Sequence, residues 1–173
     1  LEGSRSTLVF CNTRSQAERW YGELAARLPE WGEALALHHG SLDREERERV
    51  EQGLKSGAIR AVVCTASLDL GVDFGPVELV IQLGSVKSVA RLLQRAGRSA
   101  HRPGETAVLA CAPTHAFELI EIAAARDAMA NGEIEARAPL DKPLDVLAQH
   151  LVTCALAGGF APDAILSEVR TTV

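Results

Sequence analysis

Short apolar runs alternate with amphipathic stretches along the first 131 residues. The runs are rich in valine, isoleucine and leucine and carry few charges, which is typical of strands that are buried on both faces of a parallel sheet. They predict five strands, over Thr7–Cys11, Ala34–His38, Ile59–Cys64, Val77–Leu83 and Thr106–Ala112.

The stretches between these runs have helical spacing and helix end signals. Thr13 and Ser15 offer N-caps to a first helix that Pro29 ends, and Asp43 opens a second helix that Gly57 closes. We expect a third helix after the fourth strand, and a fourth from a cap at Thr114 to about Ala130. Strands that alternate with helices predict an α/β fold, with a parallel sheet covered by helices on both faces.

Near residue 132 the pattern changes. The segment NGEIEARAPLDKP carries charges and two prolines with little periodicity, and it reads as a linker. Beyond it, Leu144, Leu147, Leu151 and Leu156 predict an amphipathic helix, and Pro162 begins a second helix. We therefore predict a domain over residues 1–131, a linker over 132–143 and a short helical C-terminal segment over 144–173.

Composition and charge limit the classes of function. The chain has 173 residues, 47% of them hydrophobic, with a net charge of −5, so it does not bind nucleic acid through bulk charge. No long apolar run marks a signal peptide or a membrane span, and we expect a cytoplasmic protein without a membrane partner. Four dispersed cysteines without zinc spacing are expected to be buried, reduced thiols: Cys11, Cys64, Cys111 and Cys154.

One window concentrates positive charge. No acidic residue lies between Glu78 and Glu105, and Val89, Leu92 and Leu93 are expected to face away from the cations. Five cations follow one another there at three- and four-residue spacing: Lys87, Arg91, Arg95, Arg98 and Arg102. A basic helix face of this kind can simply be exposed to water without binding an anion. Gly97 among the arginines favours the other reading, in which guanidinium groups converge on a polyphosphate.

Small and polar residues follow each of the first four predicted strands. In a parallel sheet these positions share one edge, where ligands bind and backbone N–H groups hold anions. The positions are Asn12-Thr13-Arg14, His39-Gly40-Ser41, Thr65, Gly71-Val72-Asp73 and Gly84-Ser85. They predict a surface that follows a phosphate backbone. For Asp73, a ribose contact and an Asx turn stay equally open, and the histidines are expected to be structural.

Two absent motifs narrow the chemistry. The sequence has no GxxxxGK[ST] phosphate loop and no Asp-Glu dipeptide that would hold Mg²⁺. Arginines without these parts are suited to complete a nucleotide site that is held elsewhere, as an arginine finger does. A Rossmann-type enzyme is disfavoured because no GxGxxG follows the first strand.

Four segments resemble motifs IV, IVa, V and VI of superfamily 2 helicases, in the same order. They are VFCNTR (Val9–Arg14), HHGS (His38–Ser41), CTASLDLGVDFG (Cys64–Gly75) and QRAGRSAHR (Gln94–Arg102). The connecting sequence is similar to the large helicase-related (Lhr) family, and PLDVLAQHLVTCALAGGF is similar to the segment where those proteins enter a winged-helix domain. The resemblance implies a RecA-like second motor domain over residues 1–131.

The resemblance also implies roles for individual residues. Contacts to single-stranded DNA or RNA would come from Asn12, Thr13, Arg14, Gly40, Ser41 and Thr65. Gly71 and Asp73 would approach the ATP ribose, and Gln94, Arg95 and Arg98 would face the triphosphate. ATP and Mg²⁺ would be bound mainly by a first RecA-like domain of the same polypeptide, which is the implied partner.

This chain departs from the family pattern QRxGRxxR at one position. His101 stands where the pattern has its third arginine, and Arg102 follows one place later. The arginine finger is therefore Arg98 or Arg102. We favour Arg98, since Gly97 directs it and a shift of one residue on a helix turns a side chain by about 100°. The alternative function is an ATP-independent α/β module that binds single-stranded nucleic acid.

Overall fold

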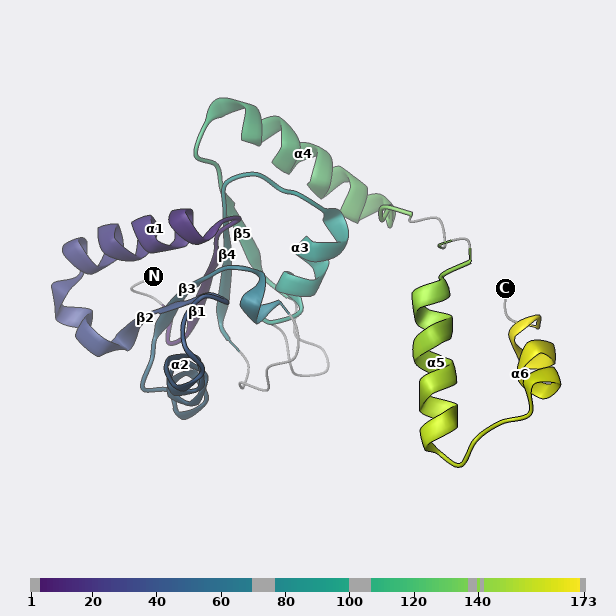
Figure 1. Ribbon diagram of the computed structural model, residues 1–173. Helices are drawn as coiled ribbons and strands as arrows, with labels where there is room; N and C mark the ends of the chain where they lie inside the picture. Colours follow the sequence, from purple (N-terminus) through teal and green to yellow (C-terminus); the bar gives the residue numbers. More distant parts are fainter. Residues whose placement is uncertain (1–3, 70–76, 100–106, 137–139, 141, 172–173) are drawn as a thin grey trace. The chain divides into compact units, whose positions relative to one another are not determined.

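A computed structural model describes residues 4–69, 77–99, 107–136, 140 and 142–171. Its centre is a five-stranded sheet in the order β2-β3-β1-β4-β5, in which every neighbouring pair is parallel (Figure 1). The strands are β1 (Thr7–Phe10), β2 (Leu35–His38), β3 (Ala61–Cys64), β4 (Leu79–Leu83) and β5 (Leu109–Ala112). The predicted α/β class is confirmed, and each strand lies inside its predicted range.

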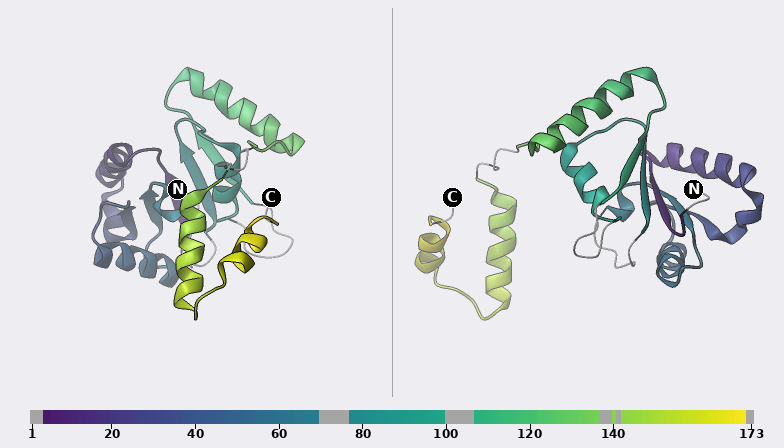
Figure 2. Two further views of the ribbon diagram at one scale, coloured as in Figure 1. Left: turned by 45° about the vertical axis from the view of Figure 1, so that its right-hand side comes forward. Right: turned by 180° about the vertical axis from the view of Figure 1, so that it is seen from behind.

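Helices cover both faces of the sheet. Helix α1 (Arg14–Arg27) and the 3₁₀ segment η1 (Pro29–Ala34) lie on one face, and α2 (Arg44–Ser56) lies on the opposite face (Figures 1 and 2). Alternation along β1 explains the two layers, because Leu8 and Phe10 join the core under α2 while Val9 joins the core under α1. All four residues of β1 are buried, which explains its continuous apolar sequence.

The predicted helix ends are largely confirmed. The Thr13 hydroxyl accepts a hydrogen bond from the backbone N–H of Gln16, and the Asp43 carboxylate accepts one from that of Glu46. Gly57 closes α2 in the left-handed conformation at φ 77°. The prediction at Thr114 was wrong by one residue: His115 is the N-cap of α4 (Ala116–Asn131), and Glu118 in the first turn accepts hydrogen bonds from the Thr114 backbone N–H and hydroxyl.

The chain forms two compact units, residues 1–135 and 136–173. The first contains the sheet, α1, α2, α3 (Val89–Ala96) and α4. The second contains α5 (Leu144–Leu156) and α6 (Pro162–Val169), neither of which has a buried residue. The division into 1–131, 132–143 and 144–173 stays a prediction. In the described part of the chain, no helix is long and apolar enough to cross a membrane.

The four cysteines are free thiols, but they are not all buried as expected. Cys11 and Cys64 are fully buried at the ends of the central strands, and burial raises the pKa of Cys11 to about 12. Cys111 on β5 and Cys154 on α5 are only partly buried. The difference has a structural reason, since β5 lies at the edge of the sheet and the described residues of the second unit form no buried core.

The end of β2 contains a buried histidine. His38 is 1% exposed, with Nδ1 2.8 Å from the Ser67 hydroxyl and Nε2 3.3 Å from a Glu51 carboxylate oxygen. It is thus a structural histidine with partners at both ring nitrogens, as expected. Burial lowers the pKa of His38 below its ordinary value, although Glu51 opposes that shift.

Gly57 provides a test of the backbone at the end of α2. A Cβ added there would meet no atom within 4 Å, so Gly57→Ala isolates the left-handed conformation from any clash. We expect the free energy of unfolding to fall by about 1 kcal/mol. Gly22→Ala, within α1 and equally unobstructed, is the matched control and should raise it by about 0.5–1 kcal/mol. Urea unfolding followed by tryptophan fluorescence measures both, and equal values for the two variants would contradict this account.

The buried His38 predicts a pH dependence of stability. Because its pKa is lowered in the folded state, the unfolded chain binds the proton more tightly. Its contribution is complete above about pH 6.5 and is lost as the pH falls toward the folded-state pKa. The free energy of unfolding should therefore fall less between about pH 7.5 and about pH 5.5 in His38→Gln than in the parent.

A residue without a titratable side chain provides the control for this measurement. Gln52→Ala should keep the parental pH dependence, since Gln52 is an exposed residue of α2 whose amide side chain does not titrate. If His38→Gln and the parent give parallel curves, His38 does not titrate as described.

Candidate functional site: a strand edge and an arginine helix

The sheet order brings three separated segments to one edge. Strands β2, β3 and β1 are neighbours, so the residues that follow their carboxyl ends lie side by side. Thr13, Arg14, Gly40 and Ser41 are exposed there, whereas Asn12 and Thr65 are partly buried. We call these six residues the strand edge. Parallel pairing over the full length of each strand, such as Phe10 with Cys64, sets their alignment.

Asn12 joins β1 to the loop that follows β4. Its amide nitrogen donates to the Ser85 carbonyl at 2.9 Å, and its amide oxygen accepts from Gln82 Nε2 at 3.4 Å. Its backbone N–H donates to Gln16 Oε1 at 3.0 Å. The side chain of Asn12 is therefore engaged within the protein and braces the edge.

The first turn of α1 carries the cation of the strand edge. Arg14 Nε lies 2.7 Å from Glu18 Oε1, and this contact lowers the pKa of Glu18. The buried His39 ring approaches the same carboxylate oxygen, at 3.4 Å from Nε2, without a well-directed hydrogen bond. A phosphate that binds Arg14 would therefore compete with Glu18 for the guanidinium.

Thr65 is held by contacts to the end of β2. Its backbone N–H donates to the His38 carbonyl at 3.2 Å, and its hydroxyl lies 3.5 Å from the Ser67 hydroxyl. Ser67 in turn donates to the His38 carbonyl at 3.2 Å. The turn after β3 and the loop after β2 are thus joined beneath the surface.

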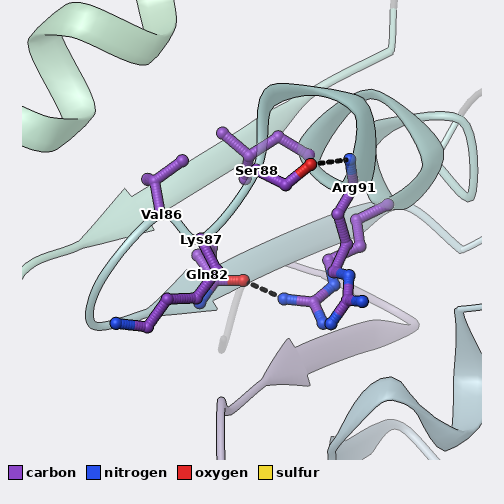
Figure 3. A pocket seen from close by; sticks show the side chains of 7 residues that line it. Gln82, Val86, Lys87, Ser88 and Arg91 are labelled. Carbon is purple, nitrogen blue, oxygen red and sulfur yellow. Dashed lines mark hydrogen bonds between the residues drawn. The ribbon is translucent and has the colours of Figure 1, made fainter. Parts of the chain in front are cut away.

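The second feature is α3, which contains two of the five cations of the basic window, Arg91 and Arg95. Ser88 caps this helix by accepting from the Arg91 N–H, and Figure 3 shows both residues beside Gln82 and Lys87 around a cavity of about 10 Å³. A cavity of that size has room for about one water molecule. The expectation that all the cations are displayed was wrong: Arg95 is 3% exposed, while Leu93 is 38% exposed.

Arg95 is buried because its charge is compensated. Its Nε and Nη2 donate to the two carboxylate oxygens of Asp69 at 2.8 and 3.2 Å. Its Nη1 donates to the Gln82 amide oxygen, and its guanidinium lies 4.4 Å from the centre of the Phe10 ring. The spacing of the cations correctly indicated a helix, but it could not show an acid 26 residues earlier in the chain.

Gln94 and Arg98 remain nearer the surface. Gln94 is exposed, and Arg98 is partly exposed with Nη2 bonded to the Asp69 carbonyl at 2.7 Å. Arg98 follows Gly97, which is the C-cap of α3 and has right-handed helical backbone angles. The other predicted residues of the nucleotide site, Gly71, Asp73 and Arg102, lie outside the described residues.

The N-terminus of α3 is occupied by a carboxylate of the same chain. Glu135 accepts from the N–H groups of Val89 at 2.5 Å and Ala90 at 3.1 Å, and these bonds lower its pKa. The loop after β4 was expected to offer such N–H groups to a phosphate. That expectation was wrong for the start of α3, since Glu135 fills the position.

Several residues of the site escaped the sequence prediction. The sequence contained an indication of Glu18, because this residue lies one helical turn after Arg14, where the two side chains can pair. It also contained an indication of Gln82, which is the single polar residue in the apolar run LVIQL. Ser67 and Asp69 lie within the motif segment Cys64–Gly75, but neither their partners nor those of Glu135 could be predicted, because these partners are 26 to 46 residues away in the chain.

The described residues contain no group of three or more histidine, cysteine, aspartate or glutamate side chains that could hold a metal ion. The exposed or partly exposed polar groups of the described site include hydroxyl, amide and guanidinium groups. Such groups bind phosphate oxygens, and arginine does so with two donors at once.

Two family comparisons cover most of the chain. Residues 1–104 match the family described as helicase conserved C-terminal domain. Residues 127–173 match the family described as large helicase-related protein, winged helix domain.

Individual relatives agree with these matches. The chain is 41% identical over 156 residues to ATP-dependent helicase Lhr-Core protein 2 of Thermococcus barophilus, which covers 90% of this chain and 18% of that protein. It is 46% identical over 158 residues to ATP-dependent helicase Lhr-Core of Methanocaldococcus jannaschii, again with coverage of 90% and 18%. The chain thus spans about a fifth of the length of these relatives.

A solved structure extends the agreement to three dimensions. The structure of Mycobacterium smegmatis helicase Lhr bound to ssDNA and AMP-PNP matches with a TM-score of 0.82 and 42% identity, over 98% of this chain and 22% of that one. The chain that forms this sheet, the strand edge and α3 therefore belongs to the helicase conserved C-terminal domain family, within the Lhr-type helicases.

Proposed function

We propose that this chain is the second motor domain of an ATP-dependent helicase or translocase that moves along single-stranded nucleic acid, of a DNA-repair type. The alignment of the strand edge over three neighbouring parallel strands is the observation that carries the proposal. The first RecA-like domain of the same polypeptide would be its partner.

The strand edge would hold the sugar–phosphate backbone of one strand. Thr13 and Ser41 offer hydroxyls, Gly40 offers backbone, and Arg14 offers the charge-assisted contact. These groups position a backbone without reading its bases. The single-stranded DNA in the similar Lhr structure supports this assignment. DNA and RNA are both compatible with contacts of this kind.

The arginine side would complete the ATP site. Arg98 is the described cation suited to a triphosphate, because its guanidinium is partly exposed and Asp69 fixes its direction. The exposed Gln94 amide can donate beside it. Gly71 and Asp73 would approach the ribose. The donor groups at the end of α3 fit a polyphosphate, and the AMP-PNP complex of the similar Lhr structure supports this use.

Hydrolysis of ATP would transfer its terminal phosphoryl group to water and change how the two motor domains are arranged. Arg98 would stabilise the negative charge that develops on that group. ATP and Mg²⁺ would be held mainly by the first domain, since this sequence has no GxxxxGK[ST] phosphate loop. The second unit, with α5 and α6, would be the beginning of a winged-helix domain, which the family match over residues 127–173 supports.

Arg98→Ala tests the arginine finger in the full-length protein. ATP turnover in the presence of a single strand should fall by about 10³–10⁵, because the lost charge acts in the transition state. ATP affinity should change little for the same reason. Steady-state kinetics measures both quantities, with Arg126→Ala on α4 as the control for loss of an exposed cation.

Two outcomes would change this assignment. If Arg102→Ala lowers turnover by this amount and Arg98→Ala does not, the finger is Arg102. If neither variant affects turnover while strand binding persists, this chain takes no part in ATP hydrolysis. The ATP-independent binding module is then the better description of it.

Arg14→Ala tests the strand edge separately. Removal of one cationic contact to a single strand should lower the slope of log affinity against log salt by about 0.7. Arg27→Ala is a matched control, because Arg27 also pairs with a glutamate of α1 one turn away, at 3.4 Å, but lies at the other end of the helix. Fluorescence titrations of a labelled oligonucleotide at several salt concentrations give both slopes. Equal slopes in the two variants would remove Arg14 from the strand path.

A further inference from the structure

Asp69 is the residue on which the two arginines of the ATP side converge. Its carboxylate accepts hydrogen bonds from Nε and Nη2 of Arg95, and its backbone carbonyl accepts one from Nη2 of Arg98 at 2.7 Å. It is 6% exposed and directly follows the short 3₁₀ turn η2 (Ala66–Leu68). Arg91 Nε lies 3.7 Å from the same carboxylate.

Arg95 is enclosed by these contacts. Asp69 binds one edge of its guanidinium, Gln82 binds Nη1, and the Phe10 ring lies 4.4 Å from it. With 3% of the residue exposed, the guanidinium is committed to the interior of the domain. In this arrangement Arg95 anchors the end of α3 to the sheet and does not reach a ligand at the surface.

Arg98 lies one turn after Arg95 and is restrained by backbone hydrogen bonds, one of them to Arg95. The Arg98 N–H donates to the Arg95 carbonyl at 3.0 Å, and the Arg98 carbonyl accepts from the Val77 N–H at 3.3 Å. Both backbone groups of Arg98 are therefore held, one of them by the residue that Asp69 binds. The Asp69 carbonyl then bonds the side chain itself.

We propose that Asp69 is a positioning residue, which holds Arg95 through its carboxylate and thereby directs Arg98 toward the triphosphate. The proposal rests on the proposed function, because it assigns the ATP contact to Arg98. Asp69 is buried, and the described side chains that its carboxylate and carbonyl contact include Arg95 and Arg98. In this proposal its effect on ATP turnover passes through Arg98.

Asp69→Asn in the full-length protein is the principal test. Asparagine keeps the shape and one acceptor but loses the charge and the second acceptor for Arg95. We expect kcat for ATP to fall tenfold or more, with KM for ATP changed by less than about threefold. Asp127→Asn is the matched control, because Asp127 on α4 forms an exposed pair with Arg126 at 3.1 Å. That variant should keep the parental kcat.

A double-mutant cycle separates positioning from stabilisation. In the Arg98→Ala background, Asp69→Asn should have no further effect on single-turnover hydrolysis, since the residue it positions is gone. Thermal unfolding of each variant shows that it is folded under the assay conditions. A merely structural role would lower turnover by the same factor in both backgrounds, and that result would overturn the proposal.

A second variant keeps the test decisive if Asp69→Asn does not fold. Asp69→Asn combined with Arg95→Gln removes both buried charges and leaves amide partners in their place. The same cycle with Arg98→Ala then applies. If Arg98→Ala alone leaves turnover unchanged, the assignment of the finger fails. If Arg98→Ala abolishes turnover while folded Asp69 variants keep parental kcat, only the positioning role fails.

Discussion

The buried pair of Asp69 and Arg95 is the contact on which the arginine side of this domain depends. An arginine that is 3% exposed requires compensation for the loss of its hydration. Asp69 supplies two acceptors, Gln82 a third, and the Phe10 ring a favourable face. Removal of one partner of such a pair typically costs about 3–5 kcal/mol, because the other charge stays buried. The pair therefore fixes the C-terminal end of α3 and, with it, the position of Arg98.

The parallel sheet creates the other half of the site. Residues that are distant in the chain become neighbours because β3 lies between β2 and β1. Buried hydrogen bonds then join the loops behind the edge, through Asn12 and Ser85 on one side and His38 and Ser67 on the other. The exposed groups of the strand edge are thus presented by a framework that is itself fully paired at these points. This arrangement suits a surface that must hold a strand repeatedly in the same register.

The two candidate surfaces use charge in different ways. On the strand edge, Arg14 is exposed and paired with Glu18, and a phosphate that bound there would replace a weak surface pair at small cost. At the end of α3, the charge of Arg95 is neutralised inside the domain, and Arg98 is held by a neutral carbonyl. The bond from Nη2 to the Asp69 carbonyl fixes the direction of the Arg98 guanidinium, which in the proposed function would stabilise developing negative charge.

The local features of the chain were predictable from the amino-acid sequence. The strands, the caps at Thr13 and Asp43, the left-handed Gly57 and the order of the motifs follow from short-range sterics, hydrogen bonding and apolar periodicity. These interactions act over a few residues, so the sequence contains them directly. The resemblance of the motifs likewise identified the family that the comparisons show.

Only the tertiary structure decided which polar groups are buried and what they bind. The spacing of the cations predicted one helix, of which α3 contains Arg91 and Arg95, but it could not show that Asp69 takes Arg95 into the interior. Nor could it show that Glu135 caps α3 from 46 residues away. These pairs depend on how the strands are ordered and how α3 packs on the sheet. A charge stays buried only where that packing brings it a partner, and no local pattern records the partner.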